Sequence, residues 1–233
     1  MEFPGRWLVA AAVFLAVSGS GSIAPAWFDE THVAVARAAG YPKWFNAAAA
    51  DVARIKLGEK EGHNHFVNNP RGTVVTSETV LEQAERYDRY DPGGHLYGAI
   101  VASVRKHIRR KREGRYAEHH LAYAAHYIGD LSQPLHHTLH DDYNRRNHLR
   151  TDGVVNDEVL GRLDRIRTYP IEIRTENDLV REIAGIANRS MALGYRLEEE
   201  DRLLSREEAY RQLSHSASLL KAVLDYVALV SPK

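Results

Sequence analysis

Histidine and aspartate are concentrated between residues 119 and 152 of this chain. Seven of its thirteen histidines lie in that stretch, and the chain contains no cysteine. A metal site built here would therefore use imidazole nitrogens and carboxylate oxygens, without thiolates. That donor set suits zinc and related first-row ions used for hydrolysis, and it is unlike a thiolate-rich structural site.

Two histidine–aspartate pairs in this stretch have helical spacing. His126 precedes Asp130 by four residues, and His148 precedes Asp152 by four. On a helix, residues four apart stand on one face, so each pair can offer a nitrogen and a carboxylate to one ion. His136 follows just after Pro134, where a helix would bend or end. One such pair alone would favour an ordinary polar helix face, but two pairs and a third histidine predict a metal site, in which Asp130 could bridge two ions.

The segment from His126 to His136 reads H-Y-I-G-D-L-S-Q-P-L-H. It closely resembles the H-Y-x-G-D-x-x-Q-P-L-H signature of the superfamily of zinc-dependent phospholipases C and single-strand-specific nucleases. The resemblance extends from Trp27 to about Asp157. It implies an all-α, single-domain fold with three zinc ions in a cleft, where a zinc-activated water attacks a phosphodiester.

Residues 1–26 have the features of a secretory signal peptide. Arg6 begins a short basic region, residues 7–17 form an apolar core too short to span a bilayer comfortably, and Ala24-Pro25-Ala26 is an A-x-A-like cleavage site. We therefore expect a mature domain, residues 27–233, that is secreted or periplasmic. The alternative is an uncleaved anchor.

Cleavage after Ala26 would make Trp27 the new N-terminus, where a free amine and the first carbonyl oxygen can chelate an ion. His32 follows five residues later. In the superfamily that the sequence resembles, the mature N-terminal tryptophan and a nearby histidine bind zinc, and Trp27 and His32 match those positions. The alternative is that both are ordinary residues of an amphipathic helix.

Asp51 lies in an otherwise apolar run, where a carboxylate needs a partner. A salt bridge to Arg54 would satisfy it. The superfamily has a ligand aspartate 14 or 15 residues before a ligand histidine, and Asp51 precedes His65-Phe66 in that way. We therefore expect Asp51 and His65 to be ligands, with Asp51 also acting as a proton acceptor.

The resemblance thus implies nine zinc ligands and no other cofactor. One zinc takes Asp51, His65, His126 and Asp130, a second takes Trp27, His32 and Asp130, and a third takes His136, His148 and Asp152.

The substrate is harder to predict than the metal site. The interval from His136 to His148 is short, as in phospholipases C, and it lacks the G-G-N element and the tryptophan of the nuclease signature. Glu30 matches a headgroup-binding glutamate of choline-preferring enzymes, whereas Val52 replaces an aromatic residue of that site. Asp152, in place of glutamate, is nuclease-like. We expect phospholipid hydrolysis of phospholipase C type, with a single-strand-specific endonuclease or 3′-nucleotidase as the alternative and a non-catalytic zinc-binding module as the third.

The amino-acid composition indicates which kinds of partner and which fold class to expect. Lys and Arg together number 31, as do Asp and Glu, so no overall basic excess attracts bulk nucleic acid or anionic membrane. We expect transient membrane-surface contact and no stable protein partner. Ala, Leu, Arg and Glu are common in the chain, and these residue types favour helices. These are predicted over residues 28–39, 44–56, 77–89, 95–112, 116–131, 154–167, 178–193 and 206–230, with loops at 58–73 and 137–147 and a new helix beginning at His148.

Overall fold

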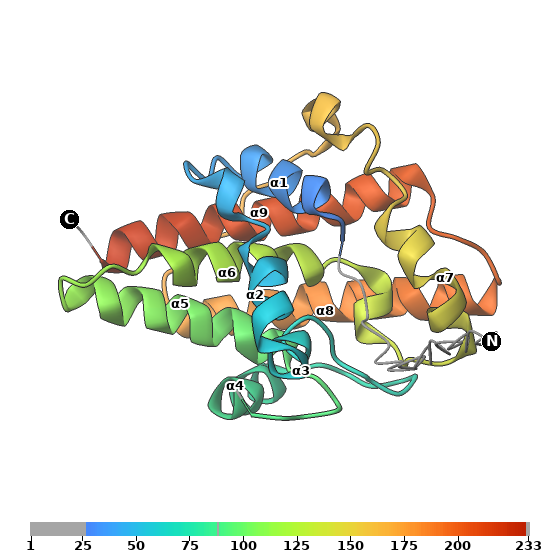
Figure 1. Ribbon diagram of the computed structural model, residues 1–233, viewed down its shortest axis with the longest axis horizontal. Helices are drawn as coiled ribbons and strands as arrows, with labels where there is room; N and C mark the ends of the chain where they lie inside the picture. The colour runs from blue at the N-terminus through green and yellow to red at the C-terminus, as the bar shows by residue number, and fades with distance from the viewer. Residues whose placement is uncertain (1–26, 88, 232–233) are drawn as a thin grey trace, which may run out of the picture.

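The computed structural model describes residues 27–87 and 89–231 (Figure 1). The predicted signal peptide, residues 1–26, lies outside the described residues. Within them the protein is helical and forms no strand, and one isolated parallel bridge joins Asn69 to Thr138. The expectation of an all-α protein is confirmed.

Nine α-helices and four short 3-10 helices make up the described chain. In order they are α1 (Asp29–Ala38), η1 (Trp44–Asn46), α2 (Ala49–Leu57), α3 (Glu59–Gly62), α4 (Ser77–Arg86), α5 (Leu96–Arg112), α6 (Glu118–Asp130), η2 (Pro134–His137), α7 (Asp142–Asp152), η3 (Val159–Gly161), η4 (Leu163–Arg165), α8 (Glu176–Glu199) and α9 (Arg206–Val230).

Helix α6 is the centre of the arrangement. It packs against α5, α9, α2 and α1, and α5, α8 and α9 run along the same long axis of the molecule (Figure 1). Its residues Ala124, Tyr127 and Ile128 are buried in the core that these helices enclose. Segments distant in the sequence therefore meet along α6.

The two longest helices begin at side-chain caps that the sequence encodes. Thr175 and Asp178 form a capping box at the start of α8, and Ser205 and Glu208 form another at the start of α9. Each box satisfies backbone N–H groups that have no partner inside the helix. By length and composition α9 could cross a membrane, but residues along it such as Leu213 are buried in the protein core.

Close backbone contact holds η2 in place. A β-carbon at Gly194 of α8 would lie 2.5 Å from the carbonyl oxygen of Pro134. Only glycine allows α8 to approach the 3-10 turn so closely. That approach fixes the turn that carries His136.

Three local predictions were wrong. Residues 154–167 form turns, η3 and η4 instead of a helix. The segment 137–147 is a loop only at its start, because α7 begins at Asp142, capped by the Asp141 side chain that accepts a hydrogen bond from the Asn144 amide at 2.9 Å. His148 therefore lies within a helix and does not begin one. The predicted loop at 58–73 contains the short helix α3.

Candidate metal centre

Helix α6 presents His126 and Asp130 on one buried face. Both side chains are fully buried, and His126 Nε2 lies 3.4 Å from Asp130 Oδ2. The Nδ1 atom of His126 lies 2.8 Å from the carbonyl oxygen of Ala47, an acceptor. Nδ1 must therefore carry a proton in that hydrogen bond, which leaves Nε2 as the ring nitrogen that faces Asp130 and is available to bind an ion.

His65 and Asp51 complete a group of four around this pair. His65 Nδ1 lies 2.9 Å from Asp130 Oδ2 and 3.3 Å from His126 Nε2. Asp51 reaches in from α2, with oxygens 3.9 Å from His65 Nδ1 and 3.7 Å from His126 Nε2. The structure thus brings together the four residues that the family resemblance assigned to one ion.

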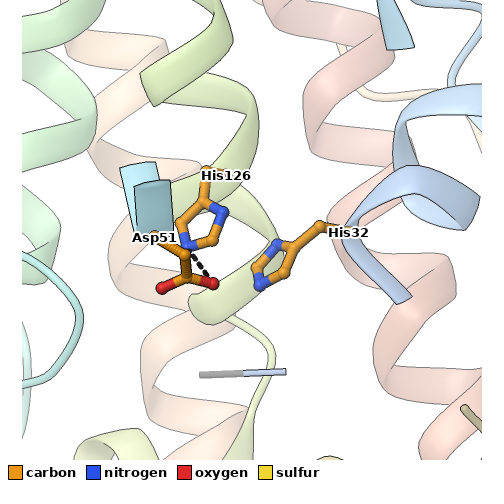
Figure 2. Close-up of side chains that lie close together, drawn as sticks. All are labelled: His32, Asp51 and His126. Atoms are coloured by element: carbon orange, nitrogen blue, oxygen red, sulfur yellow. Dashed lines mark ion pairs between the residues drawn. The ribbon is translucent and has the colours of Figure 1, made fainter. Parts of the chain in front are cut away.

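Helix α1 brings His32 against the same face (Figure 2). Its ring stacks on His126 with centroids 3.8 Å apart, and its Nε2 lies 3.4 Å from Asp130 Oδ1. His32, Asp51 and His126 form a second group whose ligand atoms lie within 4.8 Å of one another. A β-carbon at Gly129 would lie 2.4 Å from His32 Nδ1, so the glycine of the α6 motif makes room for this imidazole.

The third group joins η2 to α7. His136, His148 and Asp152 are all buried and offer ligand atoms within 4.8 Å of one another. His148 Nδ1 lies 2.7 Å from Asn144 Oδ1, so Nδ1 carries the proton when Oδ1 accepts the hydrogen bond. The other ring nitrogen, Nε2, faces Asp152 Oδ2 at 3.6 Å. His136 Nδ1 lies 3.7 Å from Asp130 Oδ1, which links this group to the others.

The spacing of these atoms suits shared ions better than mutual hydrogen bonds. Atoms bound to one tetrahedral zinc at about 2.0–2.1 Å lie roughly 3.3–3.4 Å apart. Most of the distances within the three groups are 3.3–3.9 Å. Asp130 Oδ1, Asp152 Oδ2 and His32 Nε2 are buried without a hydrogen bond, a costly state that a cation would relieve. The residues present therefore fit zinc.

Charges in the cluster are strongly coupled. Burial opposes ionisation of Asp130, but the neighbouring imidazoles, His126 foremost, hold its pKa well below the usual range. Burial disfavours a charge on His126, yet Asp130 and Asp51 raise its pKa to about 9. Burial, with His126 nearby, lowers the pKa of His32. Burial raises the pKa of Asp152 well above its usual range, against the opposing hydrogen bond from Gln133.

Two charged residues near the cluster were given no functional role from the sequence, and Arg54 was considered there only as a salt-bridge partner of Asp51. Asp29 lies one helical turn before His32, and its pKa is raised by burial and then by Asp51. Arg54 lies three residues after Asp51, and although burial lowers its pKa, Asp51 is the carboxylate that counteracts this most. Both positions follow from helical spacing relative to a predicted ligand, a signal that the sequence does carry.

Three further polar residues support the ligands. Glu61 accepts a hydrogen bond from the Tyr127 hydroxyl and lies 3.8 Å from His65 Nε2. Gln133 donates a hydrogen bond to Asp152 Oδ1 and caps η2, and Asn144 contacts His148. Such contacts orient metal ligands. Glu61 and Asn144 each lie four residues before a predicted ligand, and Gln133 is part of the quoted motif, so the sequence carries a signal for all three.

Other predicted positions lie at or away from the cluster. Trp27 is buried at the start of the described chain, so the role of its amine stays a prediction. Glu30 is exposed, and its role in binding a headgroup also stays a prediction. His137 contacts the Leu131 carbonyl and the Tyr97 hydroxyl through its two nitrogens, which makes it structural. An open hollow beside Tyr169 and His215 shares no residue with the cluster.

A scan of the sequence against protein-family models found no match, and a search among curated proteins found none either. The resemblance to the phospholipase C and nuclease superfamily therefore depends on the motif residues themselves.

Proposed function

We propose that this protein is a zinc-dependent phosphodiester hydrolase of phospholipase C type. The observation that carries the proposal is the convergence of three histidine–aspartate groups on one buried carboxylate, Asp130. A structural zinc site is usually closed by four ligands, whereas this cluster offers eight side chains of ligand type. Its size favours catalysis over a purely stabilising role.

The chain's own residues supply complementary parts of the reaction. Zinc bound here would polarise the phosphoryl oxygens and activate a water molecule. Asp51 lies at the edge of the cluster with 28% of its side chain exposed, so it can accept a proton from an incoming water. Arg54 lies three residues after Asp51 on α2, where its guanidinium would be able to bind a phosphate oxygen. Asp130 contacts histidines of all three groups and would hold those groups at fixed distances from one another.

Phospholipid is the favoured substrate. The chain has no net charge, and phosphate-backbone binding usually requires a basic surface. Single-stranded nucleic acid is the second candidate, and the observation that favours it is Asp152, an aspartate where phospholipases C of this kind have glutamate.

The test is a parallel assay of zinc-loaded protein beginning at Trp27 on phosphatidylcholine, single-stranded DNA and RNA. We expect release of phosphocholine that is lost in chelator and in Asp51→Asn. The matched control Asp142→Asn makes the same chemical change on an exposed residue of α7 and should retain activity. A protein with full zinc content that hydrolyses none of the three substrates would contradict the proposal. Cleavage of nucleic acid alone would select the second candidate.

A further inference from the structure

Large exposed apolar side chains gather on η1 and α2. Of thirteen such side chains in the described part of the chain, five lie between residues 44 and 57, and we call their surface the η1–α2 face. They are Trp44, Phe45, Val52, Ile55 and Leu57, with Ile55 the most exposed at 85%. Single exposed apolar residues are common, but a cluster of them indicates a surface that contacts another apolar phase.

This face adjoins the one open edge of the cluster. The side chains of the seven other ligand-type residues in the described chain are at most 4% exposed, whereas that of Asp51 is 28% exposed. Asp51 is followed directly by Val52, and Ile55 lies one turn further along the same outer side of α2. In Figure 1, α2 crosses in front of α6 on the outside of the molecule. A substrate that enters beside Asp51 therefore passes the η1–α2 face.

The charges around the face suit an anionic lipid surface. Lys56 and Lys60 are exposed at the end of α2 and in α3, and Glu59 is the single acidic residue between them. The chain as a whole has no net charge, so this basic character is local. Exposed apolar residues combined with lysines are typical of helices that lie in the plane of a membrane interface.

We propose that the η1–α2 face is an interfacial site that seats the protein on a phospholipid surface and presents the lipid phosphate to the cluster at Asp51. Phe45 and Ile55 enter the headgroup region, while Lys56 and Lys60 contact lipid phosphates. The inference rests on the proposed phospholipase activity for its purpose, but binding to a lipid surface can be measured separately from hydrolysis.

The experiment uses zinc-loaded protein beginning at Trp27 and vesicles of phosphatidylcholine with a fifth of phosphatidylglycerol. Binding is measured by co-sedimentation and by the emission of Trp44, which should shift to shorter wavelength, since the other tryptophan of that protein, Trp27, is buried. The double variant Phe45→Ser/Ile55→Ser should bind vesicles at least about tenfold more weakly, given the apolar area removed. Its ratio of vesicle hydrolysis to hydrolysis of monomeric short-chain phosphatidylcholine should fall by a similar factor. Leu229→Ser, at a site 66% exposed on α9, is the matched control and should match the parent protein in both measurements.

The outcomes separate the two proposals. Vesicle binding that depends on Phe45 and Ile55, without hydrolysis of any lipid, would support this inference and contradict the proposed function. Hydrolysis of monomeric lipid with no vesicle binding, or with binding that Phe45→Ser/Ile55→Ser leaves intact, would overturn the inference alone. Loss of single-stranded DNA cleavage in the double variant, with vesicle binding unchanged, would also overturn it and assign the face to nucleic-acid stacking.

Discussion

Replacing Asp130 by asparagine tests the centre of the proposed metal site. The substitution keeps the shape of the side chain and removes its charge. Asp130 lies 2.9–3.7 Å from His65, His32, His126 and His136, so the change affects every group at once. We expect zinc content to fall and zinc affinity to weaken by more than about 100-fold. Loss of a residue that only hydrogen-bonds to a metal ligand already weakens metal affinity about 10–100-fold.

The same variant should also destabilise the metal-free protein. The pKa of His126 is raised to about 9 although burial opposes its charge, because Asp130 and Asp51 attract the charged ring by more than burial disfavours it. Removing one partner of a buried ion pair costs about 3–5 kcal/mol. At about 2–4 °C per kcal/mol for a domain of this size, the melting temperature in chelator at pH 6 should fall by roughly 6–12 °C.

The assay combines elemental analysis after dialysis, zinc titration calorimetry and thermal unfolding in chelator. Two variants serve as controls. Asp142→Asn makes the same change on a side chain that is 83% exposed, and His140→Ala removes an imidazole from the loop before α7. Both should retain more zinc and more activity than Asp130→Asn. If Asp130→Asn and the controls have equal, small effects, then Asp130 does not bridge the groups.

Four other outcomes can be checked independently. Elemental analysis of the dialysed mature protein should find about three zinc ions per chain by ligand count, and one or none would refute the trinuclear site. Protein beginning at Ala26 should hold less zinc and turn over more slowly than protein beginning at Trp27, because a peptide nitrogen is a poor donor; equality in both would exclude the amine as a ligand. Arg54→Gln should lower kcat/KM for phosphodiesters about 100-fold with zinc content unchanged, and an unchanged kcat/KM would remove Arg54 from phosphate binding. Glu208→Gln should cost about 1 kcal/mol of stability at pH 7, since Arg202 lowers the pKa of Glu208 to about 2; that stabilisation is present above about pH 4.5 and is lost as the pH falls toward 2, so a difference that is constant with pH would contradict it.

Of the two helices that begin at a capping box, α9 was predicted with its full length, whereas α8 was predicted over 178–193 and extends over Glu176–Glu199. Helix α9 begins after Ser205 and ends at Val230 as expected, and its S-x-x-E capping box is visible in the sequence. Helix α7 was partly missed because it is strongly polar and has no apolar stripe; its signal was the capping residue Asp141. Residues 154–167 have apolar spacing typical of a helix, but the chain there forms turns followed by the two 3-10 helices η3 and η4.

The candidate site was predictable as a set of residues but not as an arrangement. Spacing within one segment indicated pairs such as His126 with Asp130, and the resemblance linked the segments. It could not show that α1 stacks His32 on His126, since that contact depends on how separate helices pack. The exposure of Ile55 is likewise a property of packing, because Ile55 looks like a core residue in the sequence.

The wide separation of the ligands along the chain has a consequence for how the protein folds. His65 and Asp130 are 65 positions apart, and the groups together draw on residues from His32 to Asp152. Closing such long loops is costly in entropy, so an ion cannot be held until most helices have docked. Zinc is therefore expected to act after the folding transition state, lengthening the lifetime of the native protein while leaving the rate of its formation nearly unchanged.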